Sequence, residues 1–550
     1  MYREVRGLHQ AAYILALFAV GSQILAVVRD RLLAHLFGAG SELDLYYAAF
    51  RIPDLMFVLF ASVLSVYVLL PFVSRYTEEG GAAAGARVIS QVFSIFLIMY
   101  SVVALLLAFG AHWYIPMLFP GFVEQAGLLS TLTQILMFQA FLLGVSSLCG
   151  VVTQMSHRFV LYAVSPLLYN LGIIFGVAVL YPYFGLAGLV IGVVLGALGH
   201  LLIQVPYVAQ SDYRFGFVFK YDWALLRDVL FVSIPRALTL SVNQIVLLVL
   251  TGMATTMVVG SVSVFQFAFN LQSVPLAVIG MSYSVAAFPT LSTLLAKNMV
   301  KEFNHQLLTA LRHIIFWAVP ITALVIVLRA QIVRVLLGTG AFDWGDTRLT
   351  AAALALFVIS LIAQSVLLLL VRAFYAGGRT VLPLVVSVSA SLVSIGLAFY
   401  FRGLYQASES FRIMLETTFR LEGVVGVEIL VLVLAFIAGQ FLQLIILMTL
   451  SVRTFSISYR PLIRLFTEAF AAALAGGFSA YAALAFVVDG VNQDTFIGIS
   501  LQGLVAGIMG MTAVILVYRL VKAPELFEIY RSFHSKIFKT DIIAPQPDTL

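Results

Sequence analysis

The stretch Ser22–Pro71 reads SQILAVVRDRLLAHLFGAGSELDLYYAAFRIPDLMFVLFASVLSVYVLLP. It holds two apolar runs on either side of a glycine-containing turn. The charged residues in and beside these runs are Arg29, Asp30, Arg31, Asp44, Arg51 and Asp54. A charge inside an apolar helix is costly in hydrocarbon, so it marks a candidate functional site that faces protein or water. The stretch therefore predicts two membrane-spanning helices with a polar inner face.

The composition of the whole chain supports the same class. Hydrophobic residues make up 62% of the 550 residues and charged residues only 10%, whereas a soluble domain carries roughly 25% charged residues. Most apolar runs are about 20 residues long, which is the length a helix needs to cross a bilayer. The short alternating segments of an outer-membrane barrel are absent from the sequence. We expect an all-α polytopic membrane protein with about 14 transmembrane helices.

The predicted helices cover most of the chain. They run over residues 10–37, 45–74, 88–111, 127–152, 159–181, 183–207, 228–256, 262–296, 313–328, 349–371, 380–401, 424–451, 465–488 and 497–518. Two connections are longer than turns, Ser211–Arg227 and Arg402–Gly423. An even number of spans puts both termini on one side of the membrane.

The distribution of lysine and arginine predicts which side that is. Of the 31 basic residues, 21 fall on the side of the termini, six on the opposite side and four inside spans. Basic loops stay in the cytoplasm, so both termini of this multi-pass protein should be cytoplasmic. This scatter of basic residues also explains the net charge of +6 without a nucleic-acid partner.

Weak internal repetition predicts two lobes. Ser22-Gln23-Ile24 recurs as Asn243-Gln244-Ile245, and Ala49-Phe50-Arg51 recurs as Ala268-Phe269-Asn270. Six spans per copy make the repeat parallel, as in transporters whose halves face a central cavity. The predicted parts are a six-helix lobe at 1–210, a cytoplasmic loop at 211–227, a second six-helix lobe at 228–453, two additional helices at 454–521 and a cytoplasmic tail at 522–550.

Several isolated features complete the residue pattern. Arg236 follows Pro235, and a backbone broken by proline is tolerated only beside protein or water, so Arg236 is a candidate for the cleft between the lobes. Gly188, Gly192, Gly196 and Gly199 form a small-residue face for close helix packing. The single cysteine, Cys149, excludes an internal disulfide and a cysteine zinc cluster. Enzyme motifs, cofactor motifs and metal-spaced histidines are absent from the sequence, so we expect a protein that is not an enzyme.

The opening stretch resembles the signature of the MurJ (MviN) family of lipid II flippases. The matching features are the Arg29-Asp30 pair, the turn Phe37-Gly38-Ala39-Gly40 and Asp44 before aromatic residues. Further similarity lies at 165–170, which reads SPLLYN, and at 241–245, which reads SVNQI. The resemblance implies the fourteen-helix exporter fold and outward movement of an undecaprenyl-linked peptidoglycan precursor.

The resemblance also implies a binding site. Family arginines of the first, second and eighth spans hold the diphosphate and sugar, and the positions carried over here are Ser22, Arg29, Asp30, Asp44, Arg51 and Asn270. We add Arg236 as a substitute cation. This chain departs from the family pattern at Gln23, Phe57-Val58 and Asn270, where the family has arginines. Leu250 stands where sodium-coupled members carry an aspartate.

The sequence thus predicts a lipid II flippase that works by alternating access. The alternatives are a related exporter of another lipid-linked oligosaccharide or of drugs, and a membrane scaffold without transport. The expected partners are the lipid-linked substrate, membrane lipids and cell-wall synthesis proteins.

Overall fold

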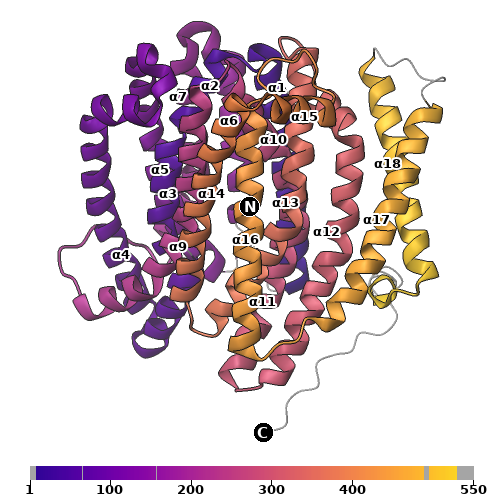
Figure 1. Cartoon of the computed structure of the whole chain (residues 1–550). Coiled ribbons are helices and arrows are strands. Elements are labelled where there is room, and N and C mark those ends of the chain that lie inside the picture. The colour runs from indigo at the N-terminus through magenta and orange to yellow at the C-terminus, as the bar shows by residue number, and fades with distance from the viewer. Residues whose placement is uncertain (1–7, 65, 157, 488–494, 529–550) are drawn as a thin grey trace. The chain divides into compact units, whose positions relative to one another are not determined.

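The computed structural model describes residues 8–64, 66–156, 158–487 and 495–528. In these residues all regular structure is helical (Figure 1). The first part holds α1 (Leu8–Phe37), α2 (Ser41–Ala49), α3 (Arg51–Val63), α4 (Val66–Leu118), η1 (Pro120–Gln125), α5 (Ala126–Met155), α6 (Phe159–Phe175), η2 (Gly176–Leu180), α7 (Tyr181–Leu202) and α8 (Val205–Gln210). The rest holds α9 (Trp223–Thr255), α10 (Ser261–Leu276), η3 (Ala277–Met281), α11 (Ser282–Ala296), α12 (Val300–Leu336), α13 (Trp344–Ala376), α14 (Val381–Ala407), α15 (Glu409–Phe419), α16 (Ile429–Phe455), α17 (Arg460–Val487) and α18 (Phe496–Leu520). The expected all-α polytopic class is confirmed.

The number of spans is consistent with fourteen. Among the described residues, 11 helical stretches are long and apolar enough to cross a membrane. One of them, Phe159–Gln210, has 52 residues, which at 1.5 Å per residue is more than twice the thickness of a hydrocarbon core. It reverses at Gly185, whose φ of 58° breaks the helix, so it supplies two spans. Two further spans lie outside those stretches. One is the charged helix α1, and the other is the segment that runs from α3 into the start of α4.

The second predicted span, 45–74, is not a continuous helix. It is divided into α2, α3 and the start of α4, with breaks at Phe50 and Leu64. The first break has a local cause in Pro53, which has no N–H to donate to the carbonyl of Ala49 and is tolerated only in the first turn of a new helix. The prediction of one unbroken span was therefore wrong, and the break leaves Arg51 at the beginning of α3.

The predicted connection Arg402–Gly423 is also largely helical. Helix α14 continues to Ala407, and α15 follows at once. The Ser408 hydroxyl accepts a hydrogen bond from the N–H of Phe411, which is a standard N-terminal cap. Arg420, with φ of 56°, ends α15 in the left-handed region. The other long connection is shorter than expected, because α9 already begins at Trp223.

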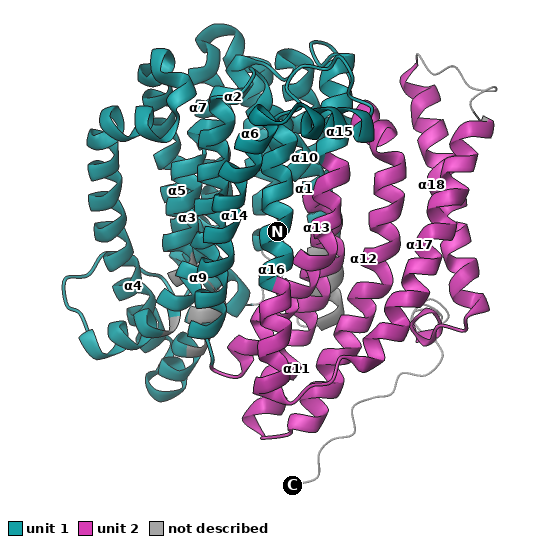
Figure 2. Ribbon diagram, in the orientation of Figure 1, with its two compact units in different colours: residues 1–271, 336–353, 379–443 teal, residues 272–335, 354–378, 444–550 magenta. Residues whose placement is uncertain are grey.

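The chain divides into two compact units, which Figure 2 shows in two colours. Unit 1 comprises residues 1–271, 336–353 and 379–443, and unit 2 comprises residues 272–335, 354–378 and 444–550. The boundary cuts through α10, α13 and α16. The units are therefore not the two predicted lobes, and both the lobes and the parallel repeat stay predictions.

In unit 1 the predicted small-residue face of α7 is confirmed. It packs against α6, where a Cβ added to Gly172 would lie 2.2 Å from the Cα of Gly196. A Cβ on Gly192 would similarly lie 2.3 Å from the Cα of Gly176. Backbones approach this closely only where neither helix carries a side chain. Cys149 is buried in the adjoining helix α5.

In unit 2 the two additional helices pack on each other and on α12. The Tyr518 hydroxyl of α18 donates to the carbonyl of Phe316 on α12 at 2.7 Å, and their rings stack with centroids 4.0 Å apart. Beyond α18, the buried carboxylate of Glu525 forms an ion pair with Arg312 at 2.6 Å. The described start of the C-terminal tail is thereby fixed to α12, whereas residues 529–550 of the predicted tail lie outside the described residues.

Candidate functional site

A network of polar side chains lies among the apolar helices of unit 1, and Arg29 of α1 is part of it. The Arg29 guanidinium forms an ion pair with Asp30 at 2.8 Å. Its Nη1 also donates to the Asn170 side-chain oxygen at 3.1 Å. Asn170, on α6, in turn donates to the Ser22 hydroxyl at 3.2 Å and to the carbonyl of Pro166. The first and fifth predicted spans are thereby joined through polar atoms.

The same network extends to α10 and α3. The second carboxylate oxygen of Asp30 accepts a hydrogen bond from the Asn270 amide at 3.2 Å. The oxygen of Asn270 accepts from Gln266 at 2.6 Å, and the oxygen of Gln266 accepts from Arg51 Nη2, also at 2.6 Å. Each bond has a charged or amide partner, which is how polar groups are kept inside an apolar region. We call these seven residues the polar network: Ser22, Arg29, Asp30, Arg51, Asn170, Gln266 and Asn270.

Five of the seven predicted substrate-binding residues belong to this network. The sequence did not single out Asn170 and Gln266, the two amides that link them. Asn170 closes the SPLLYN stretch, and Gln266 stands one turn before Asn270 on the same helix face. An amide at helical spacing from a candidate site residue is the signal that could have identified Gln266.

The two arginines of the network have different surroundings. Arg29 is partly accessible, with 20% of its side chain exposed, and Asp30 balances its charge. Arg51 is buried, with 5% of its surface exposed. Among the described residues its Nε has no hydrogen-bond partner. The network therefore offers one accessible, fork-shaped guanidinium, which suits phosphate oxygens, and one buried N–H donor with unused capacity.

Asp44 does not join the network. It follows the turn at Gly38–Gly40, where the φ of Gly38 is 57° and an added Cβ would lie 2.5 Å from the carbonyl oxygen of Ala341. This turn directs α2 toward the beginning of α10. There the Asp44 carboxylate accepts hydrogen bonds from the N–H groups of Gly260 and Ser263, both at 2.7 Å, and from the Ser263 hydroxyl. Asp44 thus caps a helix distant in sequence, and a contact with substrate stays a prediction.

Replacing Asp44 with alanine should destabilise the protein. The change leaves two buried N–H groups at the start of α10 without acceptors, and it removes a negative charge from the positive end of a helix. We expect a loss of roughly 2–3 kcal/mol. Thermal unfolding in detergent measures it, with Asp212→Ala as the control because Asp212 is exposed. Equal melting temperatures for the two variants would contradict the capping role.

The remaining predicted positions lie elsewhere on the helices. Arg236 is half-buried in α9 directly after Pro235 and stays a predicted substrate contact. Gln23, where the family has an arginine, is exposed on α1. Leu250 is fully buried in α9. In the described part of the chain, no cluster of three or more His, Cys, Asp or Glu side chains could hold a metal ion.

Comparison with known proteins identifies relatives over most of the chain. The model of the family described as "Lipid II flippase MurJ" matches residues 33–500. A probable lipid II flippase MurJ of Buchnera aphidicola is 26% identical over 383 residues, which cover 68% of this chain and 74% of the relative. The lipid II flippase MurJ of Burkholderia cenocepacia is 24% identical over 392 residues, which cover 68% of this chain and 75% of that relative.

Solved structures share the fold. A lipid II flippase MurJ in an inward closed conformation aligns over 92% of this chain and 99% of its own, with a TM-score of 0.69 and 21% identity. An inward-facing multidrug resistance transporter of the MATE family aligns over 79% of this chain and 94% of its own, with a TM-score of 0.64 and 14% identity. At these identities the structures show a common architecture.

Proposed function

Because the chain belongs to the MurJ family of lipid II flippases, we propose that it moves lipid II from the inner to the outer leaflet by alternating access. Lipid II is a polyprenyl-diphosphate-linked peptidoglycan precursor. The observation that carries the proposal for this chain is the polar network, which places guanidinium and amide groups from four helices of unit 1 in one chain of hydrogen bonds. The family is one of transporters, so no catalytic step is required.

The network supplies what a diphosphate needs inside a membrane. A charged head group cannot enter hydrocarbon unless other polar groups replace its hydration. The partly exposed Arg29 can offer two N–H groups to phosphate oxygens, while Asp30 and Asn170 hold the guanidinium in place. We infer that, when substrate binds, Asp30 gives up part of its ion pair with Arg29 and accepts hydrogen bonds from sugar hydroxyls instead. The polyprenyl tail stays in the surrounding lipid.

A related exporter of another lipid-linked oligosaccharide is the second candidate function. The observation that favours it is the neutral ion pair Arg29–Asp30, together with glutamine and asparagine at two family arginine positions, Gln23 and Asn270. Expression of this chain in a bacterium depleted of its own lipid II flippase tests the two functions. Restored growth with intact peptidoglycan supports the first function. A stable, membrane-inserted protein that leaves the cells lysing would reject it.

The proposed topology places both termini and the connection between α8 and α9 in the cytoplasm of a bacterial cell. We expect a membrane-impermeant thiol reagent, added to intact cells, to label a cysteine introduced at Glu409 on α15 and to spare one introduced at Tyr213. Both are made in a Cys149→Ala background. Permeabilised cells provide the control, since both positions should then react. Labelling of the Tyr213 position alone in intact cells would invert the topology.

A further inference from the structure

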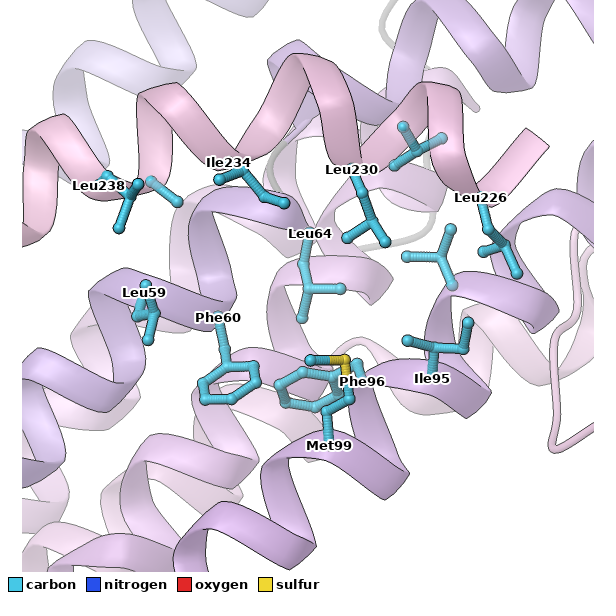
Figure 3. Close-up of a pocket in the computed structure, with 13 residues that line it drawn as sticks. Leu59, Phe60, Leu64, Ile95, Phe96, Met99, Leu226, Leu230, Ile234 and Leu238 are labelled. Atoms are coloured by element: carbon cyan, nitrogen blue, oxygen red, sulfur yellow. The ribbon is translucent and has the colours of Figure 1, made fainter. Parts of the chain in front are cut away.

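An apolar pocket lies within unit 1 between α3, α4 and α9. Its volume is about 250 Å³. Figure 3 shows the side chains that point into it, and those labelled are Leu59, Phe60, Leu64, Ile95, Phe96, Met99, Leu226, Leu230, Ile234 and Leu238. Among the side chains that the structure describes, no charged or hydrogen-bonding one lines it, so neither the diphosphate nor the sugar of the proposed substrate fits its chemistry.

The side chains that line the pocket differ in exposure. Leu64, Phe96 and Val229 are buried, whereas Met99, Ile234 and Leu238 remain between 41% and 48% exposed. The three exposed residues lie on the stretches Phe72–Leu118 and Ser233–Thr255, which are long and apolar enough to cross a membrane, so hydrocarbon chains are the medium that can reach them. A hydrocarbon chain is the group that such a space accepts from that medium.

The segment that connects α8 to α9, residues 211–222, is fixed beside this pocket. The N–H groups of Gly216 and Val218 donate to the hydroxyls of Ser90 and Ser94 on α4, at 3.3 and 2.8 Å. The N–H of Asp222 donates to the Gln91 side chain at 2.6 Å. The pocket-lining residues Val92, Ile95 and Phe96 stand on the same turns of α4. The segment therefore lies next to the end of the pocket at which α9 begins.

This segment and the first turns of α9 have the composition of a membrane interface. Phe217, Phe219 and, at the start of α9, Trp223 are exposed, and tryptophan favours the level of the lipid head groups. Charges of both signs accompany these rings: Asp212, Arg214, Lys220 and Asp222 in the segment, and Arg227 and Asp228 in α9. Arg227 stands seven residues before Ile234 and eleven before Leu238, so it shares the exposed face of α9 with these two pocket-lining residues. Its charged group lies 3.7 Å from that of Asp228 at the protein surface. This face therefore presents a cation and an anion beside the exposed side of the pocket rather than a purely basic patch.

We propose that this pocket binds one acyl chain of a zwitterionic aminophospholipid from the leaflet on the side of residues 211–222. The phosphate of its head group lies on Arg227, and its primary ammonium donates hydrogen bonds to Asp228. The balanced charges select a head group that carries both signs, and the carboxylate selects an ammonium with N–H donors over a quaternary one without them. The site is separate from the polar network and does not depend on the transported substrate.

Photo-crosslinking tests the proposal. The protein is reconstituted into vesicles with a phosphatidylethanolamine probe that carries a diazirine in one acyl chain, and labelled peptides are mapped by mass spectrometry. We expect label to concentrate on α3, α4 and α9 at the pocket residues. Leu230→Trp fills the pocket and should reduce that label roughly tenfold, because a packed apolar site does not accommodate both the indole ring and an acyl chain. Leu240→Trp, on an exposed face of α9, should leave it unchanged.

Head-group variants complete the test. The same probe with a choline head group should label the pocket about twofold to fivefold less, as should the ethanolamine probe with Asp228→Asn or Arg227→Gln, because exposed charge pairs are worth only ~0.2–1 kcal/mol. Arg412→Gln on α15 is the matched control. Label spread evenly over the lipid-facing helices would overturn the proposal. Equal labelling by the two head groups, or preferential labelling by a polyprenyl phosphate probe, would overturn the assigned occupant.

Discussion

Cells that depend on this protein for lipid II transport should stop growing when Arg29 is replaced by alanine. Arg29 is the accessible cation of the polar network, and a charge-assisted contact of an arginine fork with phosphate is worth about 1.5–3 kcal/mol. Its loss should lower flipping at least about tenfold, measured as lipid II that reaches the outer leaflet of reconstituted vesicles. Arg29→Lys should retain part of the activity, because it keeps the charge but loses the paired N–H groups.

A loss of folding has to be separated from a loss of binding in this experiment. Arg29→Ala alone leaves the buried Asp30 without its ion-pair partner, which is costly. The double variant Arg29→Ala, Asp30→Ala removes both charges and should be folded but inactive. Membrane abundance and the melting temperature in detergent monitor the folded state. A double variant that is folded and transports at the normal rate would remove Arg29 from the transport site.

Replacing Gly172 by leucine should prevent accumulation of folded protein. The Cβ alone would lie 2.2 Å from the Cα and 2.4 Å from the N of Gly196. These are backbone atoms, so no side-chain rotation relieves the clash, and α6 and α7 have to separate along a contact made of glycines. We expect a cost of about 3 kcal/mol or more in stability, at the upper end of overpacking penalties. Size-exclusion chromatography of the solubilised protein measures the folded fraction.

A matched leucine substitution controls for the helix itself. Gly396 lies inside the apolar helix α14, and a Cβ there meets nothing within 4 Å. Gly396→Leu should therefore be neutral or slightly stabilising, because leucine has a higher helix propensity than glycine. A folded, monodisperse Gly172→Leu protein would contradict the close approach of α6 and α7.

The sequence alone determined the class of the protein, and it singled out the charged residues that the structure places in the polar network. Hydrophobic length and the cost of charge in hydrocarbon are local properties, so they can be read from one segment at a time. The apolar runs thus gave the helices, and the expense of a buried arginine identified Arg29. The glycine spacing on α7 similarly revealed a packing face, since i and i+4 residues share one side of a helix.

Only the tertiary structure decided how these residues are connected. Asn170 is 141 positions from Arg29, and Asn270 is 240 positions from Asp30. No local pattern encodes which distant amide reaches a given charge, because that depends on how the helices pack. Asp44 likewise matches a position of the family signature, but its role depends on distant packing. Its carboxylate accepts a hydrogen bond from the N–H of Ser263, 219 positions away, at the start of α10. Local composition identifies the apolar helices, and long-range packing decides which of their polar side chains satisfy one another's hydrogen bonds.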